Sequence, residues 1–170
     1  RFSWGELTPK QTHYDWENYK LCKQVGEDDR DYSKFSKYVT STQWGEIDGK
    51  TRLDLEDDAA HAILGGDWHI PTTEEFQELI DNCTFENVTL NGHTVMKATG
   101  PNGNHIYFPH TGTTKIIDEI YCWTSDLEPL ANHHAVCYSI RTASGWESGG
   151  RARGAWRKCN DSAQRGRRCG

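Results

Sequence analysis

The chain has 170 residues and a formal net charge of −6, and its length suits a single domain over residues 1–170. Hydrophobic residues make up only 35% of it, but its seven Trp, seven Tyr and five Phe are large enough to form a core. No apolar run approaches the roughly 18 residues needed to cross a bilayer, which excludes an integral membrane segment. We therefore expect one domain with a core of aromatic rather than aliphatic side chains.

The charge is distributed unevenly along the chain. Residues 151–170 hold seven Lys or Arg and one Asp, a balance of +6, which leaves −12 for residues 1–150. A basic segment can bind nucleic acid, but the acidic remainder would repel a polyanion and no RRM, KH or helix-turn-helix pattern occurs. We expect no nucleic acid partner and favour docking of the basic segment on the acidic body.

The six cysteines indicate the cellular compartment. They are Cys22, Cys83, Cys122, Cys137, Cys159 and Cys169. No C-x-x-C occurs, so a zinc site or a thioredoxin-like site is poorly supported, whereas an even number of cysteines suits disulfides in an oxidising environment. We expect an extracellular, cell-surface or virion-associated protein. Because the chain begins at Arg1 within a pattern, we expect a leader or a lipoprotein anchor upstream of it.

The first predicted helix lies in LDLEDDAAHAILGG. Asp54 can cap it, the acidic run 56–58 suits the positive end of a helix, and Gly65 or Gly66 can end it. Its apolar face would consist of Leu55, Ala59, Ala62 and Ile63. A calcium loop is the alternative for the acidic run, but the D-x-D-x-D-G order is absent. Helix capping is therefore the expected role of these carboxylates.

The second predicted helix lies in GGDWHIPTTEEFQELIDNC, residues 65–83. Thr72 and Glu75 form a capping box. The apolar positions at i, i+3, i+4 and i+7 are Phe76, Leu79, Ile80 and Cys83. His69, just upstream, has no Ser or Cys nucleophile in the adjoining sequence, so we interpret this stretch as a structural joint and not as a catalytic segment.

Short strands are expected after residue 83. Asn91-Gly92 stands between two alternating runs, which is a strong hairpin signal, and Asn102-Gly103 leads into a strand over 105–108. Further β candidates are EIYCWTSDL, HAVCYSIRT and the segment around GAWRKC. Two helices followed by a β-rich half indicate an α+β fold.

Aromatic residues of the first fifty positions are spaced irregularly. Trp4, Trp16, Tyr19 and Trp44 fit neither a helical stripe nor a strand alternation. We expect them to fill gaps over a core formed by later segments.

Several separated motifs resemble one known family. They are FSWGE, LEDDAAH, GGDWHIPTTEEFQELIDNC, NGHTVMKATGPNGNHIYFPHTG and YCWTSDL, over roughly residues 2–159. Their order resembles the Fibrobacter succinogenes major paralogous domain (FISUMP) family of bacterial surface proteins. The resemblance implies a C-type-lectin-like fold, with two helices flanking a small twisted antiparallel sheet and long irregular loops on one face. Formylglycine-generating enzymes and the variable proteins of diversity-generating retroelements share that fold, so the fold alone does not choose a function.

The chain departs from the relatives of that fold at three places. Glu128-Pro129-Leu130 lacks the amide of the E-P-N triplet, and no W-N-D follows, so calcium-mediated sugar binding and a bound metal are not expected. Formylglycine chemistry requires a close cysteine pair, whereas Cys159 and Cys169 are ten residues apart, which argues against an enzyme of that type. No cofactor is expected. Substitutions over residues 122–169 on a preserved frame fit retroelement diversification, and they equally fit ordinary divergence.

The resemblance places a ligand-binding face between Asp126 and Trp156. The candidate contact residues are Asn132, His133, His134, Tyr138, Arg141, Trp146, Glu147, Arg151, Arg153 and Trp156. Such Trp, Tyr and Arg side chains dominate binding hot spots, although Trp146 and Trp156 could equally pack in the core. On a strand His133 and His134 would face opposite sides, which argues against a shared metal ion.

These observations lead to a hypothesis about function. We expect a non-enzymatic binding module, displayed outside the cell, that recognises a protein or glycan ligand through its C-terminal loops and strands. Two alternatives remain open: an enzyme of the formylglycine-generating type, and a surface assembly or pilus-tip subunit whose binding face is buried against a neighbouring subunit.

Overall fold

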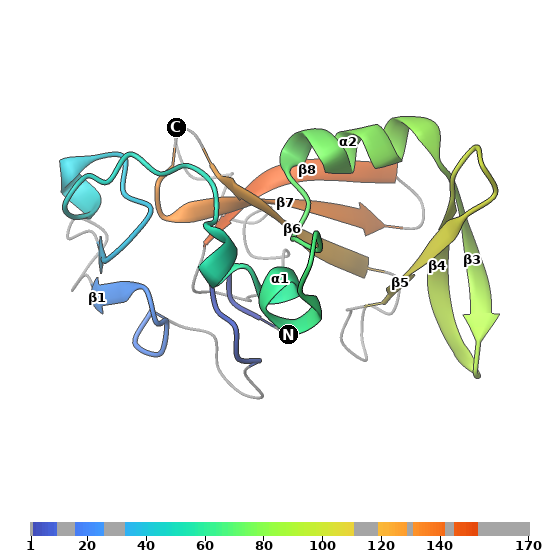
Figure 1. Ribbon diagram of the computed structural model, residues 1–170, viewed down its shortest axis with the longest axis horizontal. Helices are drawn as coiled ribbons and strands as arrows, with labels where there is room; N and C mark the ends of the chain where they lie inside the picture. Colours follow the sequence, from blue (N-terminus) through green and yellow to red (C-terminus); the bar gives the residue numbers. More distant parts are fainter. Residues whose placement is uncertain are drawn as a thin grey trace, which may run out of the picture.

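The described part of the chain forms three separate antiparallel sheets and two α-helices. The computed structural model describes residues 2–9, 16–25, 33–110, 119–128, 131–141 and 145–152, and only the backbone of 119, 140, 141 and 145–152. The sheets are β1 (Cys22–Gln24) with β2 (Lys34–Phe35), β3 (Thr84–Leu90) with β4 (His93–Thr99) and β5 (His105–Pro109), and β6 (Glu119–Leu127) with β7 (His134–Arg141) and β8 (Gly145–Ala152). The last sheet is central, and the other two lie at opposite ends of the molecule (Figure 1). The α+β class is confirmed.

The first helix differs from its prediction in its cap. A short 3-10 helix, η2 (Leu55–Asp57), precedes α1 (Ala59–Leu64), and the extended backbone of Asp58 separates them. The Asp58 carboxylate, not that of Asp54, caps α1 by accepting bonds from the backbone N–H groups of Ala60 and His61 at 2.8 and 3.0 Å. The break at Asp58 turns Leu55 away from the interior, so the expected shared apolar face is absent: Leu55 is 56% exposed. The predicted stop at Gly65 is confirmed, with φ of 70°.

The second helix, α2 (Thr73–Asn82), confirms its prediction. Thr72 and Glu75 form the capping box, and Phe76 is buried. The ring of Phe76 stacks on that of Tyr138 in β7, with centroids 4.5 Å apart. In the register of the central sheet Tyr138 is paired with Cys122, and the next pair is Trp123 with Cys137. Because side chains alternate along strands, α2 covers one face of β6 and β7, and Trp123 lies on the other face.

The two predicted hairpins are present. Asn91 and Gly92 have φ of 51° and 80° and join β3 to β4 in continuous register, from Leu90 opposite His93 to Thr84 opposite Thr99. Both turn residues therefore adopt the left-handed conformation that this turn requires. The strands β6 and β7 match the predicted segments. The strand that follows them is β8, over 145–152, and the predicted segment around 154–159 lies outside the described residues.

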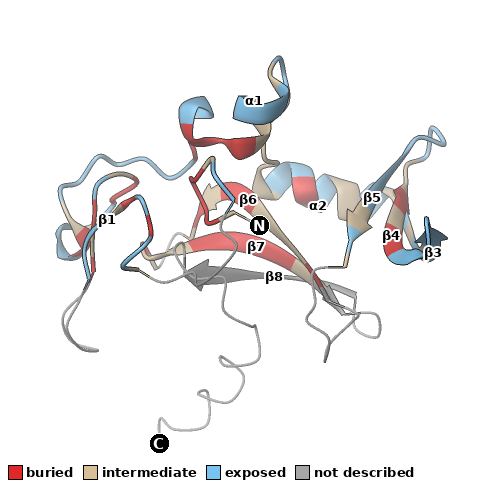
Figure 2. Cartoon of the chain, turned by 90° about the horizontal axis from the view of Figure 1, so that it is seen from below, coloured by how far each residue is buried: buried red, intermediate tan, exposed pale blue. Residues whose placement is uncertain are grey.

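The N-terminal aromatics form the main core and do not merely cover it. That core consists of Trp4, Tyr19, Leu21, Phe35, Tyr38, Val39, Trp44, Leu53, Leu127 and Ala135, with Trp16 packed against it. Among the described residues the second half contributes Leu127 and Ala135 to it, with Trp123 packed against it, so the prediction that later segments form this core is wrong. Edge-on ring packing explains the outcome: the rings of Trp4 and Tyr38 are 5.0 Å apart at 73°. Buried positions follow the N-terminal segment and the neighbouring β6 and β7 (Figure 2).

Within the described ranges Cys83 and Cys122 are free thiols, and none of the four cysteines Cys22, Cys83, Cys122 and Cys137 is bonded to another of them. Strand register explains why Cys122 and Cys137 do not form a bridge, since they belong to adjacent pairs and face opposite sides of the sheet. Cys159 and Cys169 lie outside the described residues. No helix in the described part of the chain is long and apolar enough to span a bilayer.

Candidate ligand-binding surface

The β7–β8 hairpin divides the predicted contact residues into two groups. His134 pairs with Ala152 at one end of the hairpin, and Arg141 pairs with Gly145 at the other. Seven residue steps at about 3.4 Å each place these ends about 24 Å apart. Ala135 pairs with Arg151, which puts Arg151 at the first end. A single small ligand cannot contact both groups.

Four candidates, Arg151 among them, are described by their backbone alone, and two are not described. Arg141, Trp146 and Glu147 lie at the second end of the hairpin, where Trp146 pairs with Ile140 and Glu147 with Ser139. Arg153 and Trp156 lie outside the described residues.

Asn132 is buried and serves the framework. It is only 4% exposed. Its Nδ2 donates to the carbonyl oxygen of Tyr38 at 2.8 Å, and its Oδ1 accepts from the N–H of Thr40 at 3.2 Å. Both ends of the carboxamide are therefore engaged with one turn of the backbone, which favours a structural role over contact with a ligand.

Tyr138 also faces the interior. It is 3% exposed, and its hydroxyl donates to Gln77 Oε1 at 3.2 Å, with the Thr73 carbonyl at 3.4 Å. Burial raises the pKa of its phenol, and the carboxylates of Asp81 and Glu74 add to the effect. This residue anchors α2 to the sheet, so its position favours packing over recognition.

His133 and His134 form a partly exposed aromatic ledge with Trp44. His133 lies in the turn before β7 and not on the strand, so the expectation that the two histidines face opposite sides is wrong: their rings are 4.0 Å apart. The ring of His133 stacks on that of Trp44, with centroids 4.4 Å apart at 25°. Both histidines are half-buried. We name Trp44, His133 and His134 the imidazole ledge.

One acidic cluster has the geometry of a cation site. Among the described residues, the carboxylates of Asp54, Glu56 and Asp57 lie within 4.8 Å of one another. The Lys37 ammonium occupies the space between them, with Nζ at 2.7 Å from Asp54, 2.6 Å from Glu56 and 2.6 Å from Asp57. Burial opposes the charged form of Lys37, but these hydrogen bonds outweigh burial and raise its pKa. An internal ammonium thus takes the place that a calcium ion would need.

His69 is held at both ring nitrogens. Its Nδ1 lies 3.0 Å from the Asp67 carbonyl oxygen, and its Nε2 lies 3.0 and 3.1 Å from the two carboxylate oxygens of Glu75. Both partners are acceptors, so they favour the imidazolium and raise the pKa of His69, the carbonyl first and Glu75 second. Neither nitrogen is left to accept a proton from a substrate, which supports the interpretation of this stretch as a joint.

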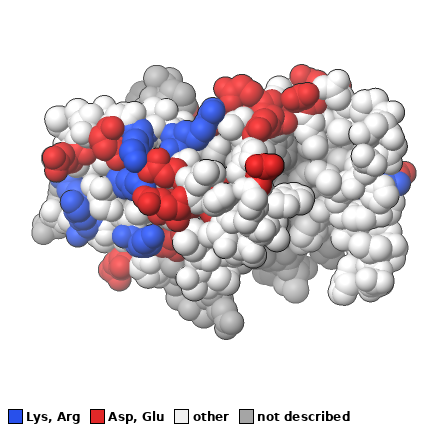
Figure 3. Space-filling view, viewed as in Figure 1, with Lys and Arg blue, Asp and Glu red and all other residues white. Residues whose placement is uncertain are grey.

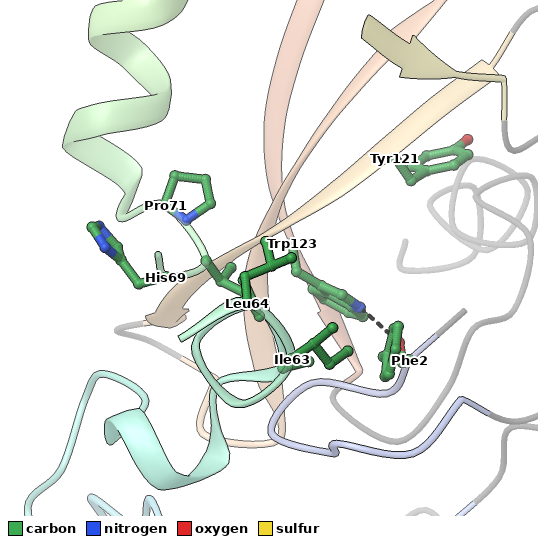
Figure 4. Close-up of a pocket in the computed structure, with 10 residues that line it drawn as sticks. Phe2, Ile63, Leu64, His69, Pro71, Tyr121 and Trp123 are labelled. Atoms are coloured by element: carbon green, nitrogen blue, oxygen red, sulfur yellow. Dashed lines mark hydrogen bonds between the residues drawn. The ribbon is translucent and has the colours of Figure 1, made fainter. Parts of the chain in front are cut away.

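An apolar pocket lies between α1, the N-terminal segment and β6, and the sequence did not indicate it. Its volume is about 570 Å³, and its walls include Phe2, Ile63, Leu64, Pro71, Tyr121 and Trp123 (Figure 4). The Trp123 indole Nε1 donates to the carbonyl oxygen of Phe2 at 3.2 Å. No local pattern could have predicted this pocket, because it depends on contacts between segments about 60 and 120 residues apart in the chain.

Comparison with known proteins adds no identification. The chain matches no protein-family model, no curated protein and no solved structure. The family resemblance drawn from the motifs therefore stays a prediction.

Proposed function

We propose that the chain is a non-enzymatic recognition module, displayed outside the cell, with a C-type-lectin-like arrangement of helices and sheet. It binds a protein or glycan ligand at the end of the central sheet where β7 begins and β8 ends. The observation that carries this proposal is the imidazole ledge: the His133 ring stacks on Trp44, and the adjacent His134 ring lies against it, beside the strand position of Arg151. Imidazole and guanidinium groups offer hydrogen-bond donors, and flat rings offer stacking surface.

Rigidity of the supporting turn favours recognition. The turn over residues 38–40 is fixed by the Asn132 carboxamide and by the Asp48 carboxylate, which accepts from the N–H groups of Tyr38 and Val39 at 2.7 and 2.8 Å. A surface that is already ordered loses less conformational entropy when a ligand binds. The ledge therefore has the pre-organisation that a binding site needs.

Two reactive side chains are poorly suited to catalysis, which supports a non-enzymatic role. Burial raises the pKa of the Cys122 thiol to about 12, with Cys137 adding to the effect, so the nucleophilic thiolate is scarce at neutral pH. His69 has both nitrogens engaged and lies at the α2 joint.

The test measures ligand capture by the intact chain on an array of immobilised glycans and on a panel of cell-surface protein ectodomains. We expect His134→Ala and Arg151→Glu to abolish capture of any ligand that the wild-type chain retains, with little change in melting temperature. His93→Ala is the matched control, because His93 is exposed on β4, outside the ledge. Ligand capture that survives both His134→Ala and Arg151→Glu, or that is lost equally in His93→Ala, contradicts the proposal.

A further inference from the structure

The corner of the molecule around α1 exposes large apolar side chains. Ile63, Leu64 and Trp68 are 62%, 60% and 65% exposed. Ile63 and Leu64 belong to the last turn of α1, and Gly65 ends the helix before the chain turns back at Trp68. Ile63 and Leu64 also form one side of the apolar pocket (Figure 4). Contiguous exposed apolar surface of this kind is typical of an interaction site.

The groups that line the pocket dictate an apolar occupant. The indole N–H of Trp123 is used on the Phe2 carbonyl, and both nitrogens of His69 are used on Asp67 and Glu75. The other walls named above are hydrocarbon or aromatic carbon, apart from the Tyr121 hydroxyl. A volume of about 570 Å³ is ample for one large side chain.

The stretch of chain that supplies most of the pocket wall carries more negative than positive charge. Residues 53–96 contain ten acidic residues and no Lys or Arg: Asp54, Glu56, Asp57, Asp58, Asp67, Glu74, Glu75, Glu78, Asp81 and Glu86. Lys37 and Lys50 neutralise the cluster at 54–57, Arg52 pairs with Glu74, and Lys97 pairs with Glu86. The buried Asp58 carboxylate accepts backbone N–H bonds, including that of Ile70 at 2.7 Å.

Four carboxylates remain without a Lys or Arg partner among the described residues. They are Asp67, Glu75, Glu78 and Asp81. Glu75 contacts His69 in the pocket wall, and Glu78 is exposed on the next turn of α2. Acidic side chains extend over α2 beyond the mixed cluster of both charges (Figure 3). Negative charge thus begins at Glu75, next to His69 in the pocket wall, and continues along α2, where a cationic partner would neutralise it.

We propose that this surface docks a polypeptide partner that inserts one large apolar side chain into the pocket and places Lys or Arg residues along α2. A neutral small molecule would leave the carboxylates along α2 without a cationic partner. A second copy of the chain would bring the same acidic surface against itself across a two-fold axis. The site is distinct from the imidazole ledge, because its strand wall is β6, at the opposite edge of the central sheet from β8.

The test uses a short synthetic peptide of Leu and Lys residues as the probe, labelled for fluorescence anisotropy against the intact chain. Its counterparts carry Glu in place of Lys, or Ser in place of Leu. We expect only the Leu/Lys peptide to bind. Leu64→Ser and Glu78→Lys should each weaken it at least about tenfold, since one buried Leu contact or one close charge reversal has about that effect. Both side chains are exposed, so folding should be retained.

Matched variants keep this test specific. Ile106 is 48% exposed on β5 and Glu46 is exposed at the far end of the molecule, so Ile106→Ser and Glu46→Lys should leave peptide affinity unchanged. If the control variants lose as much peptide affinity as Leu64→Ser and Glu78→Lys, or if the Ser-substituted peptide binds as tightly as the Leu/Lys peptide, binding is non-specific charge attraction and the proposal is overturned. Concentration-dependent dimerisation that Leu64→Ser abolishes would overturn it in favour of a second copy.

Discussion

The carboxamide of Asn132 holds the backbone of Tyr38, 94 residues away in the chain, by a 2.8 Å hydrogen bond to its carbonyl oxygen. Tyr38 is fully buried and has φ of 62°, a conformation that a bulky residue rarely adopts. Such strain persists only where surrounding contacts fix it, and Asn132 and Asp48 supply those contacts here. The turn that supports the imidazole ledge therefore depends on a residue from the other half of the chain.

Asn132→Ala should destabilise the fold. It removes two hydrogen bonds and leaves the buried carbonyl group of Tyr38 and the half-buried N–H of Thr40 without their side-chain partner, which costs roughly 1 to 3 kcal/mol. Urea unfolding measures the loss. Asn87→Ala is the control, because Asn87 is exposed on β3 and its replacement should change stability by less than about 0.5 kcal/mol. Equal stability of the two variants would show that the hydrogen bonds of the Asn132 carboxamide do not stabilise the fold.

Replacing Lys37 with Met should leave the nearly buried carboxylate of Asp57 without its main counter-ion. Lys37 is itself partly exposed, so the cost should lie below that of a fully buried pair, at about 2 to 3 kcal/mol. Lys50→Met is the matched control: Lys50 is more exposed and, within the described ranges, pairs with Asp54 alone, so its loss should cost under about 1 kcal/mol. Thermal and urea unfolding of both variants check the ranking.

The same cluster should make stability fall in acid. Burial opposes ionisation of Asp57, but bonds from Lys37 and Tyr38 outweigh it and lower its pKa, and Lys37 with Lys50 lowers the pKa of Asp54. A lowered folded-state pKa gives stability that is present above the unfolded value of about 3.9 and is lost as pH falls through the folded value. Because the pKa of Lys37 is raised, its contribution to the unfolding free energy persists until strongly alkaline pH. Unfolding free energy measured from pH 6 down to pH 2 should decline less steeply in Lys37→Met, and parallel curves would contradict this assignment.

His69 should titrate above its ordinary pKa, because the Asp67 carbonyl and the Glu75 carboxylate stabilise the imidazolium. Glu75→Gln should lower that pKa, while the glutamine keeps the capping box. NMR titration of the His69 ring measures the change, and Glu78→Gln is the control that should leave it unaltered. Since the folded-state pKa is raised, any stabilisation from this pair is present below about pH 6.5 and is lost as pH rises through the folded value. An unchanged His69 pKa in Glu75→Gln would show that the ion pair does not form.

Cys122 should resist alkylation in the folded protein. With a pKa of about 12 its thiolate is rare at pH 8, so iodoacetamide should modify it far more slowly than after unfolding in urea. Mass spectrometry of the peptide that contains Cys122 distinguishes its modification from that of the other cysteines. Equal rates in folded and unfolded chains would contradict its burial between β6 and the sheet of β3 to β5.

Local signals predicted the local elements of this fold. The Thr72–Glu75 capping box located the start of α2, and Asn91-Gly92 located the β3–β4 turn, because each signal acts within a few residues. The cap of α1 was not predicted correctly: the sequence indicated Asp54, and the structure has Asp58. The 3-10 helix η2 moves the start of α1 to Ala59, so Asp58 directly precedes α1 and caps it, while the Asp54 carboxylate pairs with Lys37 and Lys50.

The candidate site was less predictable, because burial there depends on distant partners. Asn132 and Tyr138 resemble surface contact residues in sequence. In the fold Asn132 is buried where it bonds to Thr40, and Tyr138 is buried under the ring of Phe76. The adjacency of the His133 and His134 rings depends on where β7 begins, and a shift of one residue in a strand start reverses the facing of a side chain. The apolar pocket left no sequence signal at all.

The indole of Trp4 donates to the carbonyl oxygen of Thr124 at 2.8 Å, across 120 residues of chain. A ribosome that builds this protein from its N-terminus therefore releases an aromatic-rich segment long before the strands that shelter it exist. Closing such a long loop costs conformational entropy before the stabilising contacts of the core can form. This cost slows folding and leaves the nascent chain prone to aggregation. Chaperone binding to the first fifty residues during synthesis is the expected biological consequence.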